Sequence, residues 1–228
     1  MLDLSSEQLR LYRVIVRLWR RIRLLSVDPR APDCLKPLFK RAPSLPQELL
    51  GGCQLLANRQ TLLERLPKQS VCAELGTQEG RFASAILRTT HPCELHIVDL
   101  DLSKLECREC LVADSAVTLH EMDSAACLKQ FPDNYFDWIY IDADHSYQAV
   151  RGDADVALRK IKKDGMVVFN DYILWSHEEM VPYGVVAAVN EICIEHNLAW
   201  VYFALNDSMY CDVALRRHSA YTSASLGQ

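Results

Sequence analysis

Short hydrophobic runs alternate, after Pro67, with segments in which apolar residues recur every three or four positions. The short runs predict buried strands, and the periodic segments predict helices. We expect seven strands, at residues 71–75, 95–99, 117–122, 136–141, 166–169, 200–204 and 209–215. We expect helices at residues 81–88, 124–129, 148–162 and 185–196. This alternation predicts an α/β fold with a doubly wound, mostly parallel sheet, whose last two strands pair antiparallel across a short polar turn.

The first 66 residues have a different pattern and predict a helical extension. Residues 5–25 form an amphipathic helix whose apolar stripe is Leu11, Ile15, Leu18, Ile22 and Leu25, with arginines on another face. A proline-rich connector follows, and then a second helix at residues 47–66. We therefore expect an extension at 1–66, the main domain at 67–217 and a disordered tail at 218–228. The stripe favours packing on the chain's own domain or on a second subunit over contact with a membrane.

Charge and cysteine content narrow the class of protein. The 228 residues carry a net charge of −5, and the excess of basic residues is confined to the first 41 positions, so dedicated nucleic-acid binding is not expected. Nine cysteines, no signal peptide and no apolar run long enough to span a membrane predict a cytoplasmic protein with reduced thiols. The Cys107–Cys110 pair has no partner pair at zinc-ligand spacing.

A glycine-containing loop follows the first strand of the main domain. The segment Glu74-Leu75-Gly76-Thr77-Gln78-Glu79-Gly80 joins that strand to a helix. Gly76 permits a tight turn, and Gly80 permits close approach at the helix start. One glycine of the dinucleotide fingerprint is missing, which makes a nicotinamide oxidoreductase the least favoured class. The Glu74 carboxylate suits a cationic ligand better than a diphosphate.

Polar residues end the next two strands as well. Asp99 lies 25 residues after Glu74, where a carboxylate can accept hydrogen bonds from two ribose hydroxyls. Asp123 and Ser124 follow the third strand and could hold an adenine or cap the next helix. Because the carboxyl ends of parallel strands share one sheet edge, these groups are expected to form one ligand site.

A second set of polar residues follows the strands at 136–141 and 166–169. Asp142, Asn170 and Asp171 offer the hard oxygen ligands that Mg²⁺ prefers. His145 is expected beside them, where an imidazole could take a proton from a substrate hydroxyl. The alternatives are a histidine bonded to a local carboxylate and ordinary turn chemistry at Asn170-Asp171.

From about residue 70 to 215 the chain resembles the class I S-adenosylmethionine-dependent methyltransferases. E-L-G-T-Q-E-G resembles their first motif and Asp99 their ribose-binding acid. F-D-W-I-Y-I-D-A-D-H-S-Y and D-G-M-V-V-F-N-D-Y resemble the metal-dependent O-methyltransferases that act on macrolide sugars or catechols. The resemblance implies a seven-stranded Rossmann-like fold. It also implies bound S-adenosylmethionine, Mg²⁺ on Asp142, Asn170 and Asp171, and His145 as the base.

The expected function is methyl transfer to a hydroxyl of a small molecule by a homo-oligomer. The basic N-terminal helix leaves room for other readings. One is an N-methyltransferase, or one acting on a peptide or protein, that needs no metal. Another is an inactive methyltransferase-like scaffold that only binds.

Overall fold

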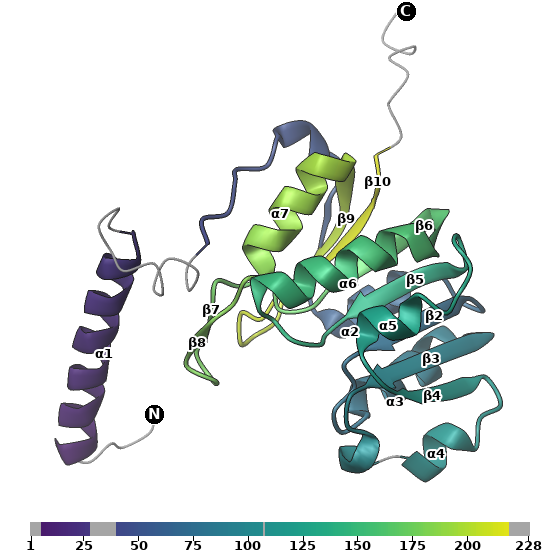
Figure 1. The fold of residues 1–228 in the computed structure, drawn as a ribbon, viewed down its shortest axis with the longest axis horizontal. Coiled ribbons are helices and arrows are strands. Elements are labelled where there is room, and N and C mark those ends of the chain that lie inside the picture. The colour runs from purple at the N-terminus through teal and green to yellow at the C-terminus, as the bar shows by residue number, and fades with distance from the viewer. Residues whose placement is uncertain (1–5, 28–39, 107, 219–228) are drawn as a thin grey trace, which may run out of the picture.

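A computed structural model describes residues 6–27, 40–106 and 108–218. Its centre is an eight-stranded sheet in the order β1-β9-β10-β6-β5-β2-β3-β4 (Figure 1). The strands are β1 (Gln54–Leu56), β2 (Val71–Leu75), β3 (Glu94–Asp99), β4 (Val117–Glu121), β5 (Phe136–Ile141), β6 (Ile161–Phe169), β9 (Leu198–Ala204) and β10 (Asp212–Arg217). Only β10 runs antiparallel to its neighbours, β9 and β6, which confirms the predicted antiparallel pair.

Helices cover both faces of the sheet, as the alternation of elements predicts (Figure 1). One face carries α5 (Ser124–Leu128), α6 (Tyr147–Lys160) and α7 (Val185–His196), and the other carries α2 (Arg59–Arg65) and α3 (Arg81–Thr90). Each layer has its own hydrophobic core, because alternate residues of the buried strands point to opposite faces. Two short elements, η3 (Leu102–Lys104) and α4 (Arg108–Val112), occupy the connection where the sequence lacks a longer helix.

The predicted helix at residues 47–66 is wrong, and the sheet has eight strands rather than seven. This stretch divides into the turn η2 (Gln47–Leu49), strand β1 and helix α2. Gly51 and Gly52 interrupt the helical pattern, and the Asn58 side chain caps α2 by accepting a 2.8 Å hydrogen bond from the Thr61 amide. Because β1 pairs in parallel with β9, the sheet begins before residue 67, where the sequence placed the start of the domain.

Two further parts lie outside the sheet. A hairpin of β7 (Trp175–Ser176) and β8 (Val181–Pro182) follows β6. Helix α1 (Ser6–Val27) stands to one side of the domain in Figure 1. Of the predicted tail at 218–228, only His218 lies within the described residues. The described cysteines are free thiols, and Cys107 of the Cys107–Cys110 pair lies outside the described residues.

A pair of histidines on β3 and β4 gives the fold a pH-dependent stability. His96 Nδ1 lies 3.1 Å from His120 Nε2, and His96 Nε2 lies 3.3 Å from Glu94, which also accepts the Tyr135 hydroxyl. Burial lowers the pKa of His96 and of His120, although Glu94 opposes the shift at His96. The unfolded chain therefore binds more protons than the folded chain as the pH falls through about 6.5.

We expect the free energy of unfolding to decrease as the pH falls from about 7 toward 5. Chemical denaturation at a series of pH values measures the slope. His120→Gln should flatten it, whereas His196→Gln, at the exposed end of α7, should leave it unchanged. A slope that is identical in the wild type and the His120→Gln variant would show that this pair does not contribute.

Candidate functional site

Two adjoining cavities lie at the carboxyl ends of the central strands. A cavity of about 390 Å³ is lined by residues that follow β2, β5 and β6 and by the β7–β8 hairpin. A cavity of about 460 Å³ lies toward β3 and β4. Gly76, Gln78 and Asp142 line both, so the two cavities form one elongated site at the sheet edge. Ligands of open α/β sheets bind at this edge.

The loop after β2 forms the middle of this site. Gly76 has a φ of +83°, and a Cβ atom there would lie 2.1 Å from the Asp142 carbonyl oxygen. Only glycine can bring the loop this close to the end of β5. Gly80 also has positive φ, but it caps α3 and faces the Leu105 side chain rather than either cavity. The structure therefore places Gly76 in the site and Gly80 behind it.

Asp99 holds the same loop in place. Its Oδ2 accepts hydrogen bonds from the Thr77 and Gln78 amides at 2.8 and 2.9 Å, and its Oδ1 accepts one from the Asp101 amide at 3.0 Å. These bonds use three of the roughly four acceptor positions of a carboxylate. Asp99 lines the cavity toward β4, where one position remains for a ligand hydroxyl.

Within the described part of the chain, one carboxylate oxygen of Glu74 is a hydrogen-bond acceptor without a donor. Its Oε2 accepts the Thr77 hydroxyl at 2.9 Å, but its buried Oε1 has no hydrogen-bond partner among the described residues. Burial raises the pKa of Glu74 to about 8, and the Thr77 bond opposes the shift. A buried oxygen without a partner costs free energy, and a ligand ammonium group would satisfy it. Glu74 lines the cavity of about 390 Å³.

Asp123 and Ser124 line the other end of the site. The Asp123 side chain accepts the Ala126 amide at 2.8 Å and caps α5, so the capping alternative is present. Both residues also line the cavity that contains Asp99. The buried Asp153 of α6 lines it too, and burial raises the pKa of this carboxyl to about 7. This end of the site is polar, and the loop that contains Gly76 and Gln78 lies between it and Glu74.

His145 is the centre of the second predicted group. Its Nε2 lies 3.2 Å from Asn170 Oδ1 and 3.6 Å from both Asp142 Oδ1 and Asp171 Oδ2. The ring stacks on Tyr183, with centroids 4.4 Å apart and planes 7° from parallel. The structure thus brings together all four residues that the sequence nominated here. Burial raises the pKa of Asp142 well above its ordinary value and that of Asp171 to about 6.

Arg59 and Asp212 complete this group and were missed by the sequence analysis. Arg59 Nε and Nη2 donate to the two Asp212 oxygens at 2.8 and 3.1 Å, and Nη2 lies 3.6 Å from Asp171. Asp212 also accepts the Tyr140 hydroxyl at 2.9 Å and the Asn170 amide at 3.1 Å. The positive charge of Arg59 opposes the rise in the pKa of Asp142 and of Asp171.

The expected magnesium site does not form with this geometry. The candidate oxygens of Asp142, Asn170 and Asp171 all lie 3.2–3.6 Å from His145 Nε2, so they surround an imidazole nitrogen. Mg²⁺ would have to lie among the same oxygens, at about 2.1 Å from each. Arg59 already provides positive charge beside the two carboxylates. In the part of the chain that the structure describes, no group of three or more His, Cys, Asp or Glu side chains is arranged to hold a metal ion. The residues as placed therefore do not fit this ion.

The β7–β8 hairpin forms the outer wall of the site. Ser176, Glu178 and Glu179 line the cavity of about 390 Å³, and the Tyr210 hydroxyl holds the hairpin by bonding to Ser176 Oγ at 2.9 Å and the Glu178 amide at 3.1 Å. The same cavity is also lined by the aromatic residues Phe82 of α3, Tyr183 and Tyr210. A third cavity, of about 330 Å³, lies between the hairpin and the loop of His145.

Comparison with known proteins agrees with this architecture. Residues 73–172 match the family model of the methyltransferase domain. The matched segment contains Glu74, the glycine loop, Asp99, the Asp123-Ser124 pair, Asp142, His145, Asn170 and Asp171, but neither Arg59 nor Asp212. No curated protein sequence is significantly similar to the chain.

Solved structures share the fold at low sequence identity. N-methyltransferase NodS from Bradyrhizobium japonicum WM9 is 19% identical, with a TM-score of 0.52, over 71% of this chain and 95% of NodS. A Burkholderia thailandensis 1,6-didemethyltoxoflavin-N1-methyltransferase, solved with that compound and S-adenosylhomocysteine, is 13% identical, with a TM-score of 0.54, over 70% and 76%. The pyocyanin biosynthetic protein PhzM is 16% identical, with a TM-score of 0.50, over 70% of this chain and 54% of PhzM.

The chain therefore has the Rossmann-like α/β fold of methyltransferases, with an additional N-terminal helix. The fold agrees with the match of residues 73–172 to a methyltransferase domain. The unsatisfied Glu74 oxygen could accept a hydrogen bond from a ligand that carries an ammonium group.

Arg59→Met should destabilise the domain by about 3–5 kcal/mol, because it leaves Asp212 buried without its partner. Urea denaturation of the variant checks this value. Arg65→Met, at the exposed end of the same helix, removes the same charge and should change the free energy of unfolding by less than about 0.5 kcal/mol. Equal effects of the two substitutions would contradict a specific role for the Arg59–Asp212 pair.

Proposed function

We propose that the protein transfers a methyl group from S-adenosylmethionine to a hydroxyl of a small molecule. The observation that supports this most is the position of His145. It lines both the cavity that contains Glu74 and the cavity beneath the β7–β8 hairpin. We place the cofactor in the cavity that contains Glu74 and the acceptor in the cavity beneath the hairpin, so a base at His145 lies between the two.

The proposed residues for the cofactor follow the sheet edge. Glu74 would accept from the methionyl ammonium, Asp99 from a ribose hydroxyl, and Asp123 and Ser124 would contact the adenine end. When bound, S-adenosylmethionine supplies an activated methyl group on a sulfonium. The loop from Gly76 to Gln78 orients it, and orientation of two reactants can account for about 7–11 kcal/mol of barrier lowering.

The hydrogen bonds around Asn170 define which nitrogen of His145 can act as the base. Asn170 Nδ2 donates to Asp212 and to the Tyr140 oxygen, so its Oδ1 faces His145. An amide oxygen only accepts, which assigns the ring proton to Nε2. Nδ1 is then free to take the proton of the acceptor hydroxyl. Asp142 and Asp171 stabilise the imidazolium that results.

Arg59 is proposed as a positioning residue in place of the expected metal. It neutralises part of the charge of Asp171 and Asp212, and through Asp212 it orients the Asn170 amide. Magnesium remains an expectation from the family resemblance, without support from the placement of these side chains. No step of the proposed reaction requires it.

The test is methyl transfer from labelled S-adenosylmethionine to a panel of polyhydroxylated small molecules, with excess chelator and again with Mg²⁺. We expect turnover of at least one acceptor, at rates in the two conditions that agree within about twofold. Loss of turnover in the chelator would contradict the metal-free arrangement. Transfer to amines or peptides, with none to hydroxyls, would contradict the acceptor class.

A further inference from the structure

Helix α1 presents hydrophobic side chains to solvent. Leu11 is 61% exposed and Leu18 is 53% exposed, although both belong to the apolar stripe that the sequence predicts to be packed. The other large apolar side chains exposed on this helix are Leu9, Tyr12, Val14 and Ile15. A surface of this kind, continuous along one helix, indicates an interaction site.

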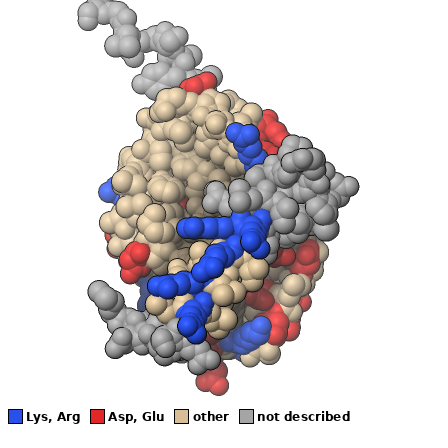
Figure 2. Space-filling model, turned by 90° about the vertical axis from the view of Figure 1, so that its left-hand side faces the viewer, with Lys and Arg blue, Asp and Glu red and all other residues tan. Residues whose placement is uncertain are grey.

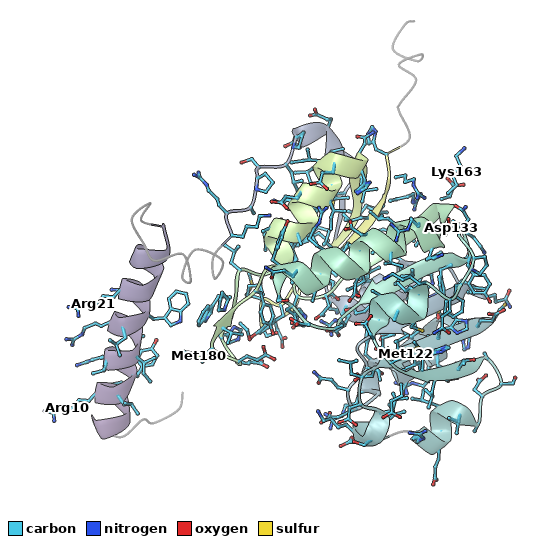
Figure 3. All side chains as sticks on the ribbon, in the orientation of Figure 1. Arg10, Arg21, Met122, Asp133, Lys163 and Met180 are labelled. Carbon is cyan, nitrogen blue, oxygen red and sulfur yellow. The ribbon has the colours of Figure 1, made fainter. Side chains whose placement is uncertain are left out.

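The opposite face of α1 is basic. Arg10, Arg13, Arg17, Arg20 and Arg21 are exposed. Figure 2 shows the blue side chains gathered along this helix, and in Figure 3 Arg10 and Arg21 point away from the domain. The helix sequence contains six arginines and a single acidic residue, Glu7.

We propose that α1 binds the surface of a membrane that contains anionic lipids. Arginines on one face and exposed leucines on the other are the features of helices that lie in a lipid interface. Arginines also add electrostatic attraction to anionic headgroups. In the described residues no helix is long and apolar enough to cross a membrane, so α1 would lie along the surface. A second copy of α1 could cover the apolar stripe, but it offers the arginines no opposite charge, because Glu7 is the only acidic residue in the helix sequence.

Helix α1 also contacts the hairpin that walls the site. The rings of Trp19 and Trp175 meet edge to face, with centroids 3.8 Å apart. Trp175 begins β7, and its neighbour Ser176 lines the cavity of about 390 Å³. Binding of α1 would therefore place the proposed acceptor side of the site beside the lipid surface. This last placement rests on the proposed function, whereas lipid binding does not.

The test is co-sedimentation of the full chain with vesicles, without cofactor or acceptor, so that its outcome is independent of methyl transfer. We expect binding to vesicles of phosphatidylcholine with phosphatidylglycerol, and much weaker binding to phosphatidylcholine alone. Arg13→Gln combined with Arg17→Gln should weaken binding about 25-fold, from about fivefold per arginine. Leu11→Ser combined with Leu18→Ser should also weaken it.

The matched control is Arg88→Gln combined with Lys163→Gln, which removes two exposed positive charges from the domain. This variant should bind vesicles like the wild type. The proposal is overturned if the full chain does not bind anionic vesicles, or if the control weakens binding as much as the α1 variant. It is also overturned if the chain forms a dimer that the α1 substitutions dissociate and binds no vesicles, because α1 would then pack on a second copy.

Discussion

His145→Ala is expected to slow methyl transfer by about 10²–10⁴-fold, the usual contribution of a positioned general base. The affinity for S-adenosylhomocysteine should change little, because the proposed cofactor contacts come from Glu74, Asp99 and the glycine loop. Single-turnover rates measure the first effect and calorimetric titration measures the second. Replacement by alanine leaves Asp142 and Asp171 in place, so the loss reports on the imidazole.

The matched control is His196→Ala, which removes an exposed histidine from the end of α7. Its rate should equal that of the wild type. A His145→Ala variant that turns over within about twofold of the wild type would contradict the assignment of His145 as the base. Loss of cofactor binding in this variant would instead place His145 in the cofactor site.

Gly76→Ala is expected to be the most damaging substitution in the glycine loop. Its φ of +83° costs an alanine about 1–2 kcal/mol, and the new Cβ would lie 2.1 Å from the Asp142 carbonyl oxygen. Overpacking of this kind adds about 1–3 kcal/mol. The melting temperature should fall by roughly 4–20 °C. Binding of S-adenosylhomocysteine should be lost at temperatures where the variant is still folded.

Gly52→Ala provides the comparison for the Gly76 variant. A Cβ at Gly52 would meet nothing within 4 Å, and this residue has no positive φ. Its melting temperature and cofactor binding should match those of the wild type. A Gly76→Ala variant with full cofactor affinity would show that the loop after β2 does not contact the ligand.

The sequence predicts the part of the fold that depends on local pattern. The strands from β2 to β6 and the helices α3, α5 and α6 are short, strongly apolar or periodic, and their existence and order are confirmed, whereas the short helix α4 was not predicted. Strand β1 was missed because three residues beside two glycines carry almost no periodic signal. Its position is decided by pairing with β9, almost 150 residues away along the chain.

For the site too, the residues at strand ends could be predicted from the local sequence, whereas contacts between distant segments could not. The residues at the ends of β2, β3, β5 and β6 could be nominated, because parallel strands bring their carboxyl ends to one edge. Asp99 has a use that the spacing does not show, since it binds the loop amides.

Arg59 lay in a stretch interpreted as one helix, where a charged residue predicts a solvated face. Asp212 offered a signal that was not used. A carboxylate within the apolar strand pattern of residues 209–215 must be paired if it is buried. That reasoning calls for a cation from elsewhere in the chain, but the sequence does not say which one.

The most direct test of cofactor binding at the sheet edge is calorimetric titration of the full chain with S-adenosylhomocysteine in excess chelator. We expect saturable binding with one site per chain, and the same affinity when Mg²⁺ replaces the chelator. Absence of binding in both conditions would contradict the proposed cofactor site, because Glu74, Gly76 and Asp99 would then form only a structural turn.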